Sequence, residues 1–182
     1  VSDRSQCERL VDEAVSRYGR IDVLVNNAGV IQVGPLASMR TEDFEQAMGI
    51  MYFGVLHPTL AALPHMRRTR GRLVNITSVG GKVSVPHLLP YSAAKFAAVG
   101  LSEGLHAELA KDGVAVTTVV PGLMRTGSPM NALFKGAARH EYAWFKVGDS
   151  IPLLTVGADR AARRVVDAAM RRRAEVHLTP LT

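Results

Sequence analysis

Two residues of this chain, Tyr91 and Lys95, have the types and the spacing needed to move a proton. If both lie on one helix, a separation of four residues puts their side chains on the same face. A free tyrosine titrates near about pH 10, and an ammonium group a few ångström away favours its phenolate form and lowers its pKa toward neutrality. Such a tyrosine can act as a general acid or base. The spacing alone is a weak signal, because ordinary surface pairs share it.

A hydroxyl donor, Ser78, strengthens this interpretation. It follows Leu73–Ile76, a short apolar segment typical of a buried strand, and it precedes Tyr91 by thirteen residues. The end of a strand and the start of the next helix can therefore bring the serine hydroxyl beside the phenol. We expect Ser78, Tyr91 and Lys95 to form one site for proton transfer and for binding a carbonyl or alcohol oxygen.

The elements that must position these side chains alternate between helix and strand. The expected helices are Cys7–Tyr18 after the possible caps Ser2 and Asp3, about Thr41–Arg68, Ser92–Asp112 and about Ala158–Arg173, and the expected strands are Ile21–Val25, Leu73–Ile76, Val114–Val120 and the weaker Glu175–Thr179. This alternation predicts an α/β fold with a doubly wound parallel sheet of the Rossmann type. Ligands bind beyond the carboxyl ends of the strands in such sheets. Asn26–Gly29, Ser78 and Pro121–Gly122 all fall there.

One segment, Leu123–Leu154, interrupts the alternation. It is too long for a plain connection and is rich in methionine, leucine, phenylalanine and tryptophan. Two interpretations stay open: a lid over an apolar substrate, or an irregular segment that packs on the core. No repeat or linker divides the 182 residues, so residues 1–182 are expected to belong to a single domain.

Composition argues against several other classes of protein. The net charge is +6, but the basic residues lie at helix ends and faces without interleaved aromatic residues, so we expect no nucleic-acid partner. The six histidines show no metal-binding spacing, and we expect no metal. Apolar stretches break before the roughly 20 residues that a membrane helix needs, so we expect no membrane segment. The single cysteine, Cys7, is interpreted as a core residue, which fits a cytoplasmic protein.

Four motifs together carry a family resemblance. They are NNAG at Asn26–Gly29, NITS at Asn75–Ser78, YSAAK at Tyr91–Lys95 and PGLMRT at Pro121–Thr126. In this order and spacing they resemble the short-chain dehydrogenase/reductase family, from the first helix to the last strand. The resemblance implies an NAD- or NADP-dependent enzyme that acts on a small apolar alcohol or carbonyl substrate and forms a homodimer or homotetramer.

The resemblance also implies roles for individual residues. Tyr91 would transfer a proton to or from the substrate oxygen, Ser78 would hydrogen-bond that oxygen, and Lys95 would hold the nicotinamide ribose and lower the tyrosine pKa. The remaining cofactor contacts would come from Asn26, Ala28 and Gly29 on the adenosine side and from Pro121, Gly122 and Thr126 beside the nicotinamide and its phosphate.

The chain departs from the family in two respects. The glycine-rich turn that should precede this region does not occur, so we expect a partial Rossmann-type domain, truncated on its N-terminal side, that is inactive alone and has an exposed apolar edge at Ile21–Val25. The choice between NAD and NADP cannot be read. Met51 stands where the family motif NxxG has asparagine, and a thioether cannot replace that amide. The alternative is therefore a non-catalytic protein that binds cofactor or ligand on the same fold.

Overall fold

The computed structural model describes residues 1–125, 132–136 and 155–179. Its helices are α1 (Arg4–Tyr18), α2 (Thr41–Met48), α3 (Gly54–Thr69), α4 (Leu89–Leu109) and α7 (Ala158–Met170), and its strands are β1 (Val23–Asn26), β2 (Gln32–Val33), β3 (Arg72–Ile76), β4 (Ala115–Val120), β5 (Leu123–Arg125), β6 (Leu133–Phe134), β7 (Thr155–Gly157) and β8 (Glu175–His177). Shorter helical turns are η1 (Leu36–Ser38), η3 (Val79–Gly81) and η4 (Ala110–Asp112). Four strands pair in parallel in the order β1-β3-β4-β8. The predicted α/β class and parallel sheet are confirmed.

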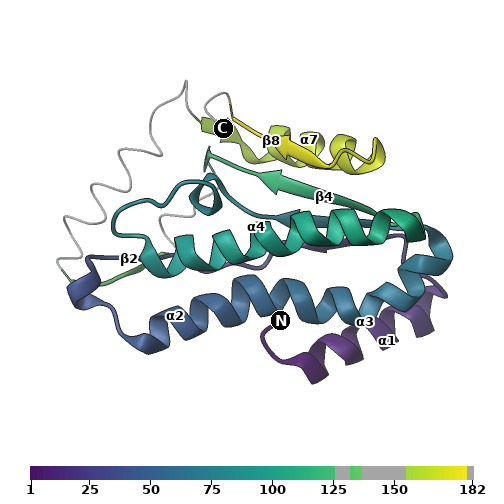
Figure 1. Ribbon diagram of the computed structural model, residues 1–182, viewed down its shortest axis with the longest axis horizontal. Helices are drawn as coiled ribbons and strands as arrows, with labels where there is room; N and C mark the ends of the chain where they lie inside the picture. Colours follow the sequence, from purple (N-terminus) through teal and green to yellow (C-terminus); the bar gives the residue numbers. More distant parts are fainter. Residues whose placement is uncertain (126–131, 137–154, 180–182) are drawn as a thin grey trace.

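Helices cover both faces of this sheet (Figure 1). On one face, Leu73 and Val116 pack with α1, α3 and α4 side chains such as Met66. On the other face, Val74 and Val119 pack with the alanines of α7. Successive residues of a strand point to opposite faces, so the central strands β3 and β4, which are covered on both faces, are mostly apolar. Their buried polar residues are hydrogen-bonded, as Asn75 is to Ser102.

Within the part of the chain that the structure describes, strand β1 lies at the edge of the sheet, with β3 as its one neighbour. Val23 and Val25 are 45% and 50% exposed, whereas Leu24 packs in the core below α3. The predicted exposed apolar edge is therefore present. The strand itself is shifted relative to the expected Ile21–Val25, because pairing with β3 extends to Asn26.

A single helical run from Thr41 to Thr69 joins α2 to α3 through η2, a π-helical segment at Gly49–Phe53. The run agrees with the expected helix of Thr41–Arg68. By length and mean hydropathy it could cross a membrane, which the sequence interpretation did not anticipate. However, 39% of its most apolar window is buried against the rest of the chain, and core helices of globular domains meet the same test.

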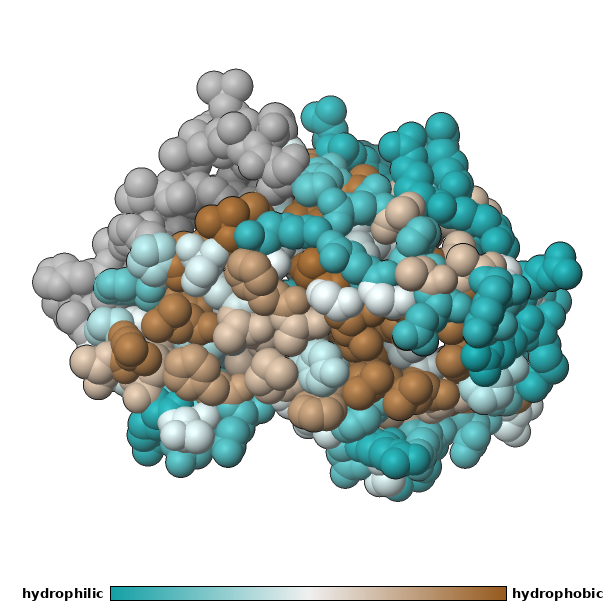
Figure 2. Space-filling view, in the orientation of Figure 1, coloured by the Kyte–Doolittle hydropathy of each residue, from teal (hydrophilic) through white to brown (hydrophobic). Residues whose placement is uncertain are grey.

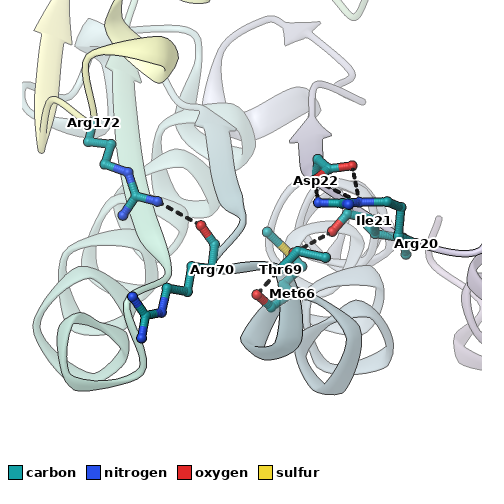
Figure 3. Close-up of polar contacts among 7 residues, drawn as sticks. All are labelled: Arg20, Ile21, Asp22, Met66, Thr69, Arg70 and Arg172. Atoms are coloured by element: carbon teal, nitrogen blue, oxygen red, sulfur yellow. Dashed lines mark hydrogen bonds and ion pairs between the residues drawn. The ribbon is translucent and has the colours of Figure 1, made fainter.

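The starts of the strands are tied together at one end of the sheet (Figure 3). The Arg172 guanidinium donates hydrogen bonds to the carbonyl oxygens of Arg70, at 2.7 Å, and Gly113, at 3.0 Å. The Thr69 hydroxyl donates to the carbonyl of Ile21 at 2.7 Å. These contacts involve four connections between helices and strands, α1–β1, α3–β3, η4–β4 and α7–β8, and they leave the opposite, carboxyl end of the sheet for a functional site.

Helix α4 begins at Leu89, before the expected Ser92, because Pro90 is well suited to the first turn of a helix. Tyr91 therefore lies within the helix. Two short parallel pairs were not predicted: β2 with β6, and β5 with β7. They include parts of the Leu123–Leu154 segment, and most of that segment, with its proposed lid, lies outside the described residues.

Candidate active site

The carboxyl ends of β1, β3 and β4 meet at one edge of the sheet, as expected for a doubly wound fold. The chain leaving β3 remains bonded to its neighbour there. The Thr77 amide donates to the carbonyl of Val119 and the Val79 amide to that of Pro121, both at 2.8 Å. Ser78, between these two bonds, is consequently held close to the segment that follows β4.

Ser78 sits at the beginning of η3. Its hydroxyl oxygen accepts a hydrogen bond from the Gly80 amide at 3.0 Å, which caps the turn. The same side chain lies close enough to the Tyr91 phenol to oppose a rise in its pKa. Ser78 is 8% exposed, so little of its side chain faces solvent.

Lys95 lies one turn after Tyr91 on α4, and its aliphatic stem is buried. Its ammonium donates a hydrogen bond to the carbonyl of Ile76 at 2.8 Å and lies 5.9 Å from the centroid of the Tyr91 ring. The structure thus brings Ser78, Tyr91 and Lys95 together, from a strand end and one helix face, as the sequence predicts.

The pKa values of the two titratable residues move in opposite directions. Burial lowers the pKa of Lys95 to about 8. Burial raises the pKa of Tyr91, and the neighbouring Ser78 hydroxyl only partly opposes this change. The expectation that Lys95 lowers the tyrosine pKa is therefore not met by the chain alone. Desolvation disfavours the phenolate more than the nearby groups favour it, so Tyr91 is held as a neutral phenol that can donate a proton.

A buried polar network lies behind these residues. The side-chain amide nitrogen of Asn26 donates hydrogen bonds to the side-chain oxygen Oδ1 of Asn75 at 2.9 Å and to the Thr59 hydroxyl at 3.1 Å. Asn75 in turn donates to the Ser102 hydroxyl at 2.9 Å, and Ser102 lies 2.7 Å from the Thr118 hydroxyl. Sequence reasoning placed Asn26 against a cofactor, but its side chain is committed to this network. The two motif asparagines could have been paired from the sequence, because their strands are neighbours.

Met51 packs against the helix that carries the site residues. It is fully buried in the π-helical segment η2, in a cluster with Ala47 and Ala94 against which Tyr91 also packs. A Cβ placed on Gly29 would lie 3.9 Å from the Met51 sulfur. The methionine therefore fills the space between β1 and α4 with an apolar side chain, in a distorted stretch of helix.

The predicted cofactor-binding residues take different positions. Ala28 and Gly29 are exposed just after β1, while Pro121 is buried and Gly122 half-buried after β4. Thr126 lies outside the described residues. Among residues 1–125, 132–136 and 155–179, no group of three histidine, cysteine, aspartate or glutamate side chains is arranged to hold a metal ion.

Comparison of the sequence with known proteins identifies the family to which the chain is related. Residues 1–135 match the family model described as short chain dehydrogenase. A putative ketoacyl reductase of Streptomyces coelicolor is 42% identical over 130 residues, which are 70% of this chain and 49% of that protein. The 3-oxoacyl-[acyl-carrier-protein] reductase FabG of Thermotoga maritima is 36% identical over 140 residues, which are 76% of this chain and 56% of that protein.

Solved structures show the same fold. A short-chain dehydrogenase from Streptomyces avermitilis superposes with a TM-score of 0.84 at 31% identity, covering 98% of this chain and 68% of that one. A short chain dehydrogenase/reductase from Burkholderia phymatum, in complex with NAD, gives a TM-score of 0.89 at 26% identity, covering 99% and 69%. The chain belongs to the short-chain dehydrogenase family, with a Rossmann-type parallel sheet. It spans about half the length of the curated relatives that it matches.

Proposed function

We propose that the full-length protein containing this chain is an NAD- or NADP-dependent oxidoreductase that interconverts an alcohol and a carbonyl compound. The observation that carries the proposal is that the Ser78 and Tyr91 side chains lie together beside the buried Lys95 ammonium, at the carboxyl edge of the sheet. Reductases and dehydrogenases among the relatives support the same reaction class.

The residues of the chain handle the proton, and a bound nicotinamide would supply or accept the hydride. In reduction, the neutral Tyr91 phenol donates its proton to the carbonyl oxygen as negative charge develops there. Ser78 contributes a second hydrogen bond to that oxygen. Lys95, held by the Ile76 carbonyl, places a positive charge near the phenol and stabilises the phenolate that forms.

The chain offers one side of a cofactor site. Ala28 and Gly29 are exposed at the end of β1, and the nearest atom to a Cβ on Gly29 would be the Met51 sulfur at 3.9 Å. A nucleotide can therefore approach that backbone closely. Pro121, Gly122 and Thr126 would border the nicotinamide. The glycine-rich phosphate loop does not occur in this chain, so both NAD and NADP remain candidates.

The substrate is proposed to be a small apolar alcohol or carbonyl compound. The support is the segment Leu123–Leu154 of the sequence, which is rich in methionine, leucine, phenylalanine and tryptophan and so favours an apolar substrate. Two relatives named as putative ketoacyl reductases support a carbonyl substrate.

A homodimer or homotetramer is proposed from the apolar outer face of the helices. Figure 2 shows hydrophobic residues gathered over the face on which α4 and the α2–α3 run lie. Phe53, Leu60 and Phe96 of these helices are 41%, 55% and 44% exposed. Large exposed apolar patches mark interfaces. A cytoplasmic location is proposed from the single, buried Cys7, which needs no oxidising compartment.

The test is a substitution of the phenol oxygen alone. Tyr91→Phe in the full-length protein should lower turnover of a panel of aliphatic ketones by about 10² to 10⁴-fold while cofactor binding is kept. Tyr18→Phe is the matched control, because Tyr18 is 69% exposed on α1. Oxidation of the reduced nicotinamide is followed by its absorbance, in separate assays with saturating reduced NAD and saturating reduced NADP. Wild-type rates in Tyr91→Phe would refute the assigned proton donor.

A second function is favoured by one observation, the buried Met51 in place of a polar residue beneath the site. If that residue is needed to relay protons, the protein binds cofactor or ligand without turnover. Saturable nicotinamide binding, together with no oxidation or reduction across the ketone and alcohol panels, would support this alternative over the enzyme.

A further inference from the structure

The turn that carries Ser78 is pressed against α4 at two consecutive glycines. A Cβ on Gly80 would lie 3.0 Å from Cε1 of Tyr91, and a Cβ on Gly81 would lie 2.6 Å from the carbonyl oxygen of Lys95. Neither glycine has a positive φ, so the requirement is for space and not for an unusual backbone conformation. The η3 turn therefore touches α4 at the two residues that form the rest of the site.

Lys82, the residue that follows η3, holds the end of this turn through two ion pairs. Its ammonium lies 2.5 Å from a carboxylate oxygen of Glu103 on α4 and 3.0 Å from one of Glu175 on β8. Glu175 also contacts the Nε2 atom of His177 at 2.6 Å. The carboxylate of Glu103, and that of Glu175, raise the pKa of Lys82 against the effect of partial burial, so the lysine stays charged.

A third attachment comes from the segment after β4, whose Pro121 carbonyl accepts the Val79 amide at 2.8 Å. The turn is thus fixed to α4 by close backbone contact, to α4 and β8 by ion pairs, and to the β4 exit by a backbone hydrogen bond. All of these contacts lie within four residues of Ser78, and none involves a reacting atom.

We propose that Gly80, Gly81 and Lys82 are positioning residues that set the separation between the Ser78 hydroxyl and the Tyr91 phenol. This inference rests on the proposed function, because the two hydroxyls must reach one substrate oxygen together. Real Cβ atoms do not approach other atoms closer than 3.0 Å, so an alanine at position 81 requires a shift of at least 0.4 Å, from 2.6 to 3.0 Å. The Lys95 carbonyl is part of a helix, so the turn moves away from it and carries Ser78 with it.

The first experiment compares Gly81→Ala with Gly104→Ala in the full-length protein. Gly104 is on α4 as well, but a Cβ there meets nothing within 4 Å. Misplacement of a reacting group by about 1 Å can cost on the order of 100-fold in rate, so a smaller shift should lower kcat about 10-fold with an unchanged KM for cofactor. Gly104→Ala should keep the wild-type kcat. Equal rates in the two variants would overturn the proposal.

A second readout does not depend on turnover. The ¹³Cζ resonance of Tyr91 at pH 7 reports the hydrogen bonding of the phenol oxygen and is assigned by its loss in Tyr91→Phe. Gly81→Ala should move this resonance in the same direction as Ser78→Ala, and Gly104→Ala should leave it in place. If the wild-type protein turns over no substrate, the proposed function fails, while this resonance still decides whether the turn positions Ser78.

Lys82 provides a variant that keeps the fold if Gly81→Ala does not. Lys82→Met removes both ion pairs from a partly exposed side chain, and we expect kcat to fall about 2- to 5-fold with a smaller displacement of the Tyr91 resonance. Lys82→Arg retains the charge and should restore both values. A Lys82→Met variant with the wild-type resonance and kcat would exclude Lys82 from the positioning role.

Discussion

Replacing Lys95 with methionine should stabilise the cofactor-free fold even though it removes a residue that the proposed reaction needs. Methionine has a similar length and keeps the contacts of the buried stem. Burial lowers the pKa of Lys95 from 10.5 to about 8. At about 1.4 kcal/mol for each pKa unit, the protonated lysine costs the folded state about 3 kcal/mol at pH 7. Loss of the hydrogen bond to Ile76 offsets about 1 kcal/mol or more of this, so a net gain of about 1 to 2 kcal/mol is expected.

The dependence on pH identifies the cause. Between about pH 8 and pH 10.5 the unfolded chain holds the Lys95 proton and the folded chain has released it, so the free energy of unfolding rises with pH. The rise should be about 2 kcal/mol from pH 7 to pH 9.5. Tyr91 acts in the opposite direction only above about pH 10, because burial raises its pKa and the unfolded state then loses its proton first.

Urea unfolding at pH 7.0, 8.5 and 9.5, without cofactor, measures these free energies. Wild type and the exposed control Lys111→Met should become more stable as the pH rises, by equal amounts, while Lys95→Met should not. The prediction is refuted if Lys95→Met is less stable than wild type at pH 7 and its free energy of unfolding rises with pH as much as that of wild type. That result would show that Lys95 is not buried as a charged group.

Three further substitutions are expected to act at other points of the molecule. Asn75→Ala should lower the free energy of unfolding by about 2 to 4 kcal/mol in chemical denaturation, because it removes one buried hydrogen-bond partner from Asn26 and one from Ser102. Arg172→Ala should cost about 1 kcal/mol in the same assay, since its two bonds to backbone carbonyls are exposed to solvent. Met51→Asn should raise turnover by up to about 10-fold in stopped-flow assays if proton relay limits the rate, at a cost of about 1 to 3 kcal/mol in stability. Unchanged turnover in folded Met51→Asn would show that protons move by another route.

Most of the fold could be predicted because the central strands β3 and β4 are buried on both faces. The apolar runs at Leu73–Ile76 and Val114–Val120 correspond to β3 and β4 within one residue at either end. The pairs β2–β6 and β5–β7 could not be predicted in this way. Their strands are only two or three residues long, and they form through long-range contacts that leave no periodic pattern in the sequence.

The members of the site could be predicted, but their electrostatic states could not. Residue types and spacing place Ser78, Tyr91 and Lys95 together, since a strand end and a helix face are both visible in the sequence. The direction of the Tyr91 pKa shift depends instead on how much protein surrounds the phenol, which only the packing of Ala47 and Met51 against α4 reveals. The contact of Asn26 with Thr59 on α3 depends on packing in the same way, whereas its contact with Asn75 follows from the neighbouring strands β1 and β3.

The opposed pKa shifts of Lys95 and Tyr91 have one physical source and one consequence for the proposed reaction. Both groups prefer to be neutral because both are desolvated, so each proton that leaves Tyr91 in reduction creates a phenolate in a place that disfavours it. A protonated Lys95 beside that phenolate offsets the cost, and the same phenolate raises the pKa of the lysine in return. The two residues then titrate as a coupled pair, with apparent values that belong to the pair. A turnover rate that falls above the lysine's own pKa of about 8 would show that the two residues titrate independently in the working enzyme. A turnover rate that is maintained to higher pH would show that the phenolate and the ammonium form together.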